Sequence, residues 1–378
     1  MSEVLDLTCE LVAIPSVNPQ ERSGFTSPYG ETSVAEFIYK WLGRNGLGPQ
    51  YQEVAPGRRN VWALAEGKDK TRTLLLSGHM DTVDVQDMRI SPFDPVVREG
   101  RLYGRGACDD KGPLACQMLA FRERVRRGDL PYSLAFLATC GEEYNLLGSR
   151  FFAANLPLRP TGAIFAEPTD LNIYIAHKGS ARLNLRTLGQ SAHSSTPHLG
   201  HNAIYRMART LTAIEGYAAS LAEKPPHPLL GTQTLAVCLV RGGQEANVVP
   251  HSCEAAIDWR FLPGGDAKIC LEELKNHLKR QKIDDFQLEL MGQFPPMTTD
   301  PESTLVQSLL EAACRHHPAA RTTGVAYATD AAVFGALRIP TPVFGPGNAA
   351  QAHTQQEFIE IYQLDKAMAI YADALKPE

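Results

Sequence analysis

The stretch "LLLSGHMDTVDV", residues 74–85, is an apolar run that stops abruptly at small and polar residues. Such a run is typical of a buried strand, in which side chains two positions apart share a face. His79 and Asp81 are therefore expected to point the same way at the carboxyl end of the strand. A carboxylate there can accept the proton of one imidazole nitrogen and leave the other nitrogen free for a metal ion. A simple strand-end turn is the alternative for these two residues taken alone.

Further apolar segments have strand composition, and they alternate with helical segments. The strands are "NVWALAEG" (60–67), "RTLLLSGHM" (72–80), "YSLAFLATC" (132–140) and "GAIFAEP" (162–168), and the helices cover about 31–45, 111–127 and 146–155. Strands that alternate with helices predict a mostly parallel sheet with helices on both faces. We therefore expect an α/β domain, in which ligands bind where strands end.

The pattern changes over residues 179–293, where apolar and polar residues alternate as in half-exposed antiparallel strands. The order strand, helix, strand, strand, helix, strand predicts an inserted α+β domain of ferredoxin-like, β-α-β-β-α-β topology. After the proline-rich segment "GQFPPMTTDP" (292–301) the earlier pattern returns. The prediction is a discontinuous first domain, residues 1–178 and 294–378, interrupted by a second domain, residues 179–293.

Composition excludes several classes of protein. The chain has 378 residues, a formal net charge of −5 and 21% charged residues, so its charge does not attract nucleic acid or an anionic membrane. No apolar stretch approaches the roughly 18 residues of a membrane span, and no secretion signal is recognisable. The eight cysteines form no C-x-x-C pair, which indicates reduced, mostly structural thiols. We expect a cytoplasmic protein whose partners include neither nucleic acid nor membrane.

Acidic residues follow three further apolar or glycine-rich segments. They are Asp109 and Asp110 in "GRGACDDKG" (104–112), Glu142 and Glu143 in "ATCGEEYNLLGS" (138–149), and Glu167 in "IFAEPTD" (164–170). Each acid taken singly can be explained as a helix cap or a turn residue. Their joint occurrence where strands and turns end favours a common site.

Several carboxylates at one edge of a sheet repel one another, and burying them is costly unless a cation compensates their charge. A divalent cation, or a pair, would remove this repulsion. His353, in "FGPGNAAQAHTQQEF" (344–358), also follows a strand and a glycine-rich turn. Mixed histidine and carboxylate ligands suit zinc, with cobalt or manganese as possible substitutes. A shared carboxylate can bridge two ions about 3.5–4 Å apart.

These motifs resemble the signature blocks of the zinc-dependent acetylornithine deacetylase, succinyl-diaminopimelate desuccinylase and carboxypeptidase G family. The blocks are "SGHMDTV", "GRGACDDKG", "CGEEYNLLGS", "AEPTD" and "GPGNAAQAHTQQEF", in the order and spacing of the family. The resemblance implies two zinc ions per subunit and a cis peptide bond after Asp109. It implies that His79, Asp109 and Glu167 bind one ion, and that Asp109, Glu143 and His353 bind the other.

The resemblance also assigns residues that act on the substrate. Glu142 is implied as the general base, and Asp81 as the residue that orients His79. The inserted segment resembles the lid and dimerisation domain of the family. In "GQSAHSSTPHLGHNAI" (189–204), His193 matches a histidine that reaches across a homodimer to stabilise the oxyanion of the partner's intermediate. The nearby His198 and His201 match no functional position.

Two further residues of the insert are implied to contact the carboxylate of the substrate. They are Asn247 and Arg260, in "GGQEANVVPHSCEAAIDWRFLPG" (242–264), which resembles the second signature of the lid. The planar guanidinium of arginine matches a carboxylate. A structural salt bridge is the alternative for Arg260.

Within the family, "AHKGSARLNLRTLGQSAHSSTP" (176–197) is more similar to acetylornithine deacetylase than to the desuccinylase, which typically has two arginines where His177 and Lys178 stand. Glu167, rather than aspartate, also suits the deacylase and carboxypeptidase G branches. The resemblance implies a homodimeric amidohydrolase acting on a small N-acyl-L-amino acid, as in arginine biosynthesis. A metallo-exopeptidase of the carboxypeptidase G or dipeptidase type and a succinyl-diaminopimelate desuccinylase are the alternatives.

Overall fold

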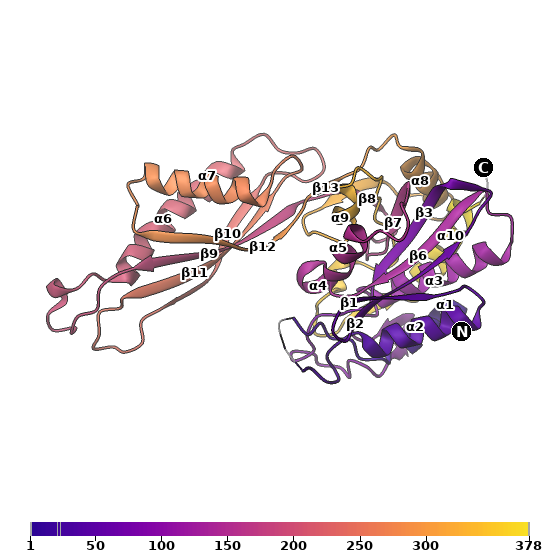
Figure 1. Ribbon diagram of the computed structural model, residues 1–378, viewed down its shortest axis with the longest axis horizontal. Helices are drawn as coiled ribbons and strands as arrows, with labels where there is room; N and C mark the ends of the chain where they lie inside the picture. The colour runs from indigo at the N-terminus through magenta and orange to yellow at the C-terminus, as the bar shows by residue number, and fades with distance from the viewer. Residues whose placement is uncertain (1, 21, 23, 377–378) are drawn as a thin grey trace. The chain divides into compact units, whose positions relative to one another are not determined.

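The computed structural model describes residues 2–20, 22 and 24–376 (Figure 1). The chain divides into two compact units. The first unit consists of Met1–Ile175, Thr298–Thr323 and Thr329–Glu378, and the second of Ala176–Met297 and Gly324–Ala328. None of the helices in the described part of the chain is long and apolar enough to cross a membrane.

A five-stranded sheet of order β1-β2-β6-β3-β7 forms the centre of the first unit. Its strands are β1 (Gln50–Ala55), β2 (Arg58–Ala65), β3 (Asp69–His79), β6 (Tyr132–Thr139) and β7 (Gly162–Phe165). β3 pairs in parallel with both β6 and β7. The carboxyl ends of these three strands therefore lie at one edge, and His79 is the last residue of β3.

The α/β class is confirmed, but the sheet is mixed where the sequence predicted a mostly parallel one. β1 pairs antiparallel with β2, and β2 antiparallel with β6. The short connections explain this difference. Only residues 56–57 join β1 to β2 and only residues 66–68 join β2 to β3, whereas two parallel strands need a crossover of a dozen or so residues. β2 therefore runs opposite to β3 and to β6, which is parallel to β3.

Helices cover both faces of this sheet (Figure 1). Along β2, Val61 and Ala63 belong to the large core, which the helices α1, α2, α3, α8 and α10 complete. Trp62 points to the other face and packs edge-on against Phe152 of α5. The bounds of the helices of this unit are α1 (Glu3–Val12), α2 (Thr32–Arg44), α3 (Lys111–Arg126), α4 (Glu142–Asn145), α5 (Leu147–Ala154), α8 (Thr304–His316), α9 (Ala331–Gly335) and α10 (Ile361–Ala374).

Two smaller sheets have three strands each. In the first unit β15 (Phe358–Glu360), β5 (Arg101–Tyr103) and β4 (Val96–Arg98) pair in that order. The strands β13 (Met297–Thr298), β8 (Ile173–His177) and β14 (Thr322–Val325) form the other sheet. The chain passes from one unit to the other within each of these last three strands.

The second unit contains an antiparallel sheet of order β10-β11-β9-β12. Along the chain its elements are β9 (Gly179–Leu188), α6 (Ala203–Ala222), β10 (Thr234–Gly242), β11 (Ser252–Phe261), α7 (Ala267–Arg280) and β12 (Phe286–Phe294). This is the predicted order of strands and helices. The apolar residues that alternate along β9 and β11 pack against both helices, and Trp259 is fully buried there.

Candidate metal centre

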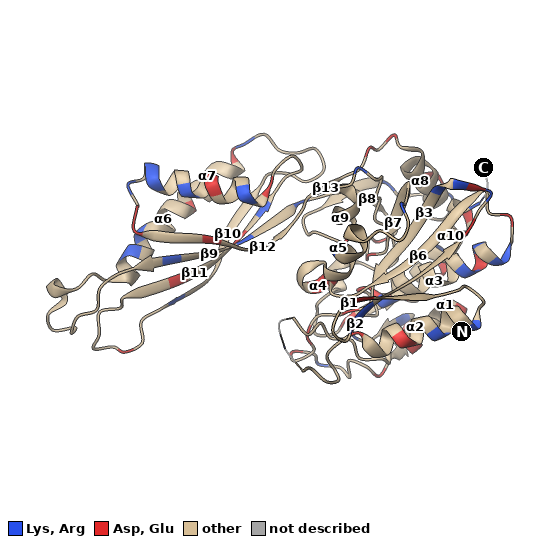
Figure 2. Cartoon of the chain, viewed as in Figure 1, with Lys and Arg blue, Asp and Glu red and all other residues tan. Residues whose placement is uncertain are grey.

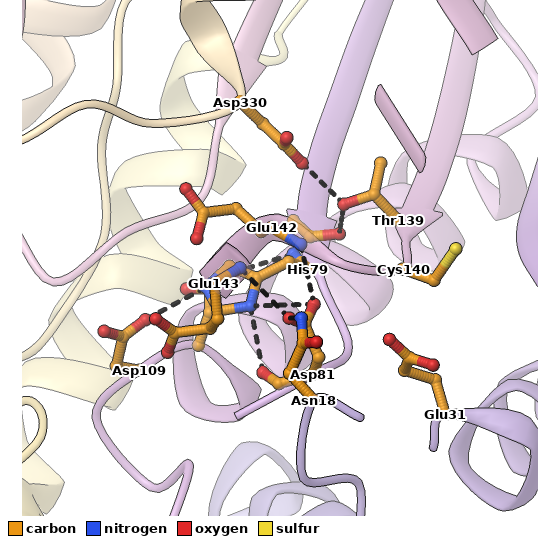
Figure 3. Close-up of polar contacts among 12 residues, drawn as sticks. Asn18, Glu31, His79, Asp81, Asp109, Thr139, Cys140, Glu142, Glu143 and Asp330 are labelled. Atoms are coloured by element: carbon orange, nitrogen blue, oxygen red, sulfur yellow. Dashed lines mark hydrogen bonds and ion pairs between the residues drawn. The ribbon is translucent and has the colours of Figure 1, made fainter. Parts of the chain in front are cut away.

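Five side chains with metal-binding chemistry meet at the carboxyl edge of the five-stranded sheet. His79 ends β3, Asp109 precedes α3, Glu143 lies in α4, Glu167 follows β7, and His353 lies between α9 and β15. All five were predicted as ligands from the sequence. The structure therefore brings together residues from five separate stretches of the chain, three of which Figure 3 labels.

The ligand atoms form two groups that share Asp109. His79, Asp109 and Glu167 make one group, and Asp109, Glu143 and His353 the other; within each group the ligand atoms lie within 4.8 Å of one another. Nε2 of His79 lies 3.0 Å from Oδ1 of Asp109, and Nε2 of His353 lies 3.3 Å from Oδ2. The two oxygens of Asp109 thus face different histidines, which is the arrangement of a carboxylate that bridges two ions.

Three glutamates in and beside the centre, Glu142, Glu143 and Glu167, are hard to ionise without a cation, whereas hydrogen bonds to His353 and His79 lower the pKa of Asp109. Desolvation raises the pKa of Glu142 and of Glu167 well above the usual value for a glutamate, and neighbouring carboxylates add to the effect. Desolvation, together with the charge of Asp109, raises the pKa of Glu143 to about 7. A divalent cation would stabilise the ionised forms of these groups.

The pKa values of the two histidines are raised by the same carboxylates. Hydrogen bonds to Asp109 and Glu143 raise the pKa of His353 to about 11. Desolvation tends to lower the pKa of His79, but the hydrogen bond to Asp109 and the nearby carboxylate of Asp81 outweigh it and hold that pKa well above the usual value. Without a metal ion, protons on these two imidazoles would offset part of the negative charge of the carboxylates beside them. Carboxylate oxygens and imidazole nitrogens are the donor set of zinc, so the residues present fit a pair of such ions.

Asp81 contacts His79 mainly through its main chain. Nδ1 of His79 lies 3.0 Å from the carbonyl oxygen of Asp81 and 3.6 Å from its carboxylate. The carboxylate instead accepts the main-chain N–H groups of Glu142 and Glu143, each at 3.0 Å, and the side-chain amide of Asn18 at 2.6 Å (Figure 3). Asp81 therefore fixes both the ring of His79 and the first turn of α4.

Glu142 and Glu143 begin a helix, whereas the sequence placed them at a strand end. β6 ends at Thr139, and Gly141 has a φ of 78°, a left-handed conformation that glycine adopts at little cost. This turn lets the chain enter α4 directly. Glu143 then lies 3.1 Å from Nε2 of His353. Glu142 is also buried here, but it belongs to neither of the two ligand groups found among the described residues.

Other buried polar residues surround the centre, and the sequence assigned them no role. Asp110 accepts the main-chain N–H of His79 at 3.2 Å, and the bond between Asp109 and Asp110 is cis, as the resemblance implied. Asp330, at the start of α9, accepts hydrogen bonds from the hydroxyls of Thr139, at 2.7 Å, and Ser149. Asp330 follows no strand pattern, so nothing in the local sequence marked it.

The remaining predicted site residues lie in the second unit. The exposed His193 contacts the hydroxyl of Ser195 through Nδ1 at 2.7 Å. The carbonyl of Asn247 accepts the N–H of Ser194 at 2.9 Å. Arg260 pairs with Asp258 through two hydrogen bonds, at 2.7 and 3.1 Å. The salt bridge considered as the alternative for Arg260 is thus present.

Comparisons with known proteins agree with the motifs. Residues 75–376 match the peptidase family M20/M25/M40. Relatives include the acetylornithine deacetylase of Proteus mirabilis, 32% identical over 364 residues, which cover 94% of this chain and 92% of the relative. The acetylornithine deacetylase of Vibrio vulnificus is 31% identical over 387 residues, which cover 98% and 97%.

Solved structures share the fold. An M20 family metallo-carboxypeptidase from Sulfolobus solfataricus has a TM-score of 0.83 at 21% identity and covers 99% of both chains. A dinuclear metal-binding peptidase of the M20 family from Bacillus subtilis has a TM-score of 0.69 at 15% identity, covering 98% of this chain and 96% of that one. The matched motifs, the matched length and the deacetylase relatives together show that this chain belongs to the peptidase family M20/M25/M40 and is a metal-dependent hydrolase.

Proposed function

We propose that this protein is a dinuclear zinc amidohydrolase that cleaves the amide bond of N-acyl-L-amino acids, with N-acetylornithine or a similar N-acetyl-L-amino acid as its substrate. The observation that carries the proposal is the shared carboxylate of Asp109, which faces two histidines beside a buried Glu142 that belongs to neither ligand group. The acetylornithine deacetylase relatives support the substrate class. A cytoplasmic enzyme of arginine biosynthesis is the corresponding role.

The residues of the first unit divide the chemistry among them. Two zinc ions, when bound here, would polarise the acyl carbonyl and lower the pKa of a water molecule; cobalt or manganese could replace them. Asp109 would hold both ions. Glu142 would accept a proton from the attacking water and deliver it to the leaving amine. Burial raises the pKa of Glu142, which makes it a better proton acceptor between these two steps.

Two residues of the second unit are proposed to bind the carboxylate of the substrate. Arg260 is half-buried and already pairs with a carboxylate, that of Asp258. A substrate carboxylate would share or replace this partner in the same bidentate geometry. Asn247 is exposed, which supports the proposal that its side-chain amide donates to a ligand.

We also propose a homodimer formed through the second unit, in which His193 acts in the active site of the partner subunit. The edge strand β10 exposes two large apolar side chains, Leu239 at 45% and Val240 at 49%. Tyr205 of α6 is also largely exposed. An edge strand with exposed apolar side chains is a surface prepared for pairing with another chain.

His193→Ala is expected to lower kcat by about 10²–10³-fold, the usual loss for one oxyanion donor. Mixing this variant with Glu142→Ala tests the role across the dimer. In a mixed dimer, one site would have its own Glu142 together with His193 from the other chain. Activity restored on mixing, relative to each variant alone, is the expected result. If the two variants exchange subunits and activity is not restored, His193 acts in its own subunit or has no catalytic role.

A substrate panel tests the reaction itself. Zinc-loaded protein is assayed on N-acetyl-amino acids, N-succinyl-amino acids and dipeptides, and we expect kcat/KM to be highest for an N-acetyl compound. The metallo-carboxypeptidase of the same fold makes exopeptidase activity the second candidate, and a preference for dipeptides would select it. A preference for N-succinyl compounds would indicate the desuccinylase reaction. Turnover of none of these amides would contradict the proposal.

A further inference from the structure

Two oppositely charged side chains are buried beside the metal centre and belong to neither ligand group. Nη1 of Arg105 lies 2.6 Å from Oε2 of Glu357, and the two side chains are 4% and 1% exposed. Arg105 follows β5 and Glu357 precedes β15, and these two strands pair with each other. A buried ion pair is weak evidence for stability, because desolvation offsets much of the Coulomb attraction. Its other contacts indicate a more specific role.

The second oxygen of Glu357 contacts the loop that carries the bridging ligand. Oε1 accepts the main-chain N–H of Cys108 at 2.9 Å and that of Asp109 at 3.0 Å. Two consecutive N–H groups that converge on one oxygen restrict both the position and the orientation of this backbone. The carboxylate of Asp109 projects from that backbone toward both histidines. Through these two hydrogen bonds, Glu357 holds the main chain from which the carboxylate of Asp109 projects.

Arg105 connects the same loop to two others. Its Nη2 donates to the carbonyl oxygen of Asp84 at 3.2 Å and to that of Thr354 at 3.4 Å. Thr354 is the residue after His353, and Asp84 lies in the loop that follows the end of β3. The planar, multiple-donor guanidinium of arginine can make these contacts at once, whereas a lysine cannot.

We propose that the Arg105–Glu357 pair sets the position of Asp109 relative to His353, and thereby determines the affinity of the site formed by Asp109, Glu143 and His353 for its cation. This inference rests on the ligand set proposed above. Arg105 and Glu357 are positioning residues, because they act through the loops that carry ligands. The group of His79, Asp109 and Glu167 depends less on the pair, because only Asp109 is held by Glu357, whereas His79 ends β3 and Glu167 follows β7.

The experiment measures Co²⁺ binding to metal-free protein, by calorimetry and by the visible absorption of the bound ions, in Arg105→Lys and Glu357→Gln. Arg105→Lys keeps the positive charge but loses the planar guanidinium with its several donors. Glu357→Gln keeps the shape of the side chain but loses its negative charge. We expect one binding step to be nearly unchanged and the other to weaken by about 10–100-fold, the usual effect of residues that support metal ligands. The visible absorption of the Co²⁺ ion bound at the weakened site should change as well. Raising the Co²⁺ concentration should restore kcat.

A matched control separates positioning from stability. Arg124 is also 4% exposed, and it contacts one carboxylate, that of Asp129 at 2.8 Å, and the carbonyl oxygens of Asp129 and Leu375. It lies in the last turn of α3, whereas the metal centre adjoins the first. Arg124→Lys is expected to lower the melting temperature and to leave both Co²⁺ affinities unchanged. Circular dichroism verifies that each variant is folded, and Arg105→Lys carries the test if Glu357→Gln does not fold.

The outcomes are distinct. Wild-type Co²⁺ affinities in folded Arg105→Lys would overturn the inference. Equal weakening of both steps, or the same weakening in Arg124→Lys, would assign the pair to general stability and overturn it too. Wild-type protein that binds fewer than two Co²⁺ ions would refute the dinuclear centre and the inference with it. That result is visible before any variant is made.

Discussion

Glu142→Gln is expected to lower kcat by about 10²–10⁴-fold, the usual contribution of a general acid–base group, while the protein keeps both metal ions. Glutamine has the size of glutamate and preserves the main-chain hydrogen bond from residue 142 to Asp81. It cannot accept the proton of the attacking water. The measurements are kcat on an N-acetyl-amino acid and the metal content of the purified variant.

Glu143→Gln is the matched control, since Glu143 is the next residue, and its main-chain N–H also bonds to Asp81. Glu143 contacts His353 and belongs to a ligand group, whereas Glu142 does not. We expect Glu143→Gln to weaken one metal site, a defect that added metal partly reverses. Near-normal turnover by metal-loaded Glu142→Gln would refute the assigned base, and loss of metal from it would make Glu142 a ligand.

Asp109→Ala is expected to weaken both metal sites by more than about 100-fold, beyond the usual effect of residues outside the ligand shell. Both ligand groups lose an oxygen at once, because His79 faces Oδ1 and His353 faces Oδ2. Turnover should fall to the detection limit. Elemental analysis after dialysis measures the metal retained per chain.

Asp110→Asn provides the comparison for this second prediction. Asp110 is the neighbouring acid and is fully buried, but it lies outside both ligand groups and accepts the main-chain N–H of His79. Asparagine can still accept this hydrogen bond, so both ions should stay bound. If the Asp109→Ala protein retained two ions, Asp109 would not be the carboxylate that bridges them. Loss of both ions only from Asp110→Asn would move the bridge to Asp110.

Local patterns in the sequence predicted the elements that position the centre. The apolar runs that became β3, β6 and β7 end at the predicted edge, and the helix predicted at 111–127 is α3, Lys111–Arg126. Polar residues that follow buried strands are conspicuous in a sequence, and two of the proposed ligands, His79 and Glu167, each come after a run of apolar side chains. The proposed ligand roles follow from the family resemblance, and the structure places the five side chains in two groups that could hold metal ions.

The direction of β2 differs from the prediction, although the chain order contains the information that determines it. The run "NVWALAEG" was expected in a mostly parallel sheet, but β2 pairs antiparallel with β6. Apolar composition reports that a strand is buried, and it does not report the direction of its neighbours. The short segment 66–68 between β2 and β3 contained the missing information, because so short a connection cannot return the chain to the start of a parallel strand, and β6 runs parallel to β3.

The sequence by itself determined which residues are buried, where strands end and which side chains there can bind a cation, because these properties depend on side-chain chemistry and on neighbours a few positions away. Only the tertiary structure decided which polar groups become partners. Glu357 and Arg105 are 252 positions apart and still form one ion pair behind Asp109. The carboxylate of Asp81 bonds to the main chain of α4 and not chiefly to His79. Such pairings depend on how distant loops pack at the sheet edge, and main-chain donors there leave no mark in the pattern of residue types.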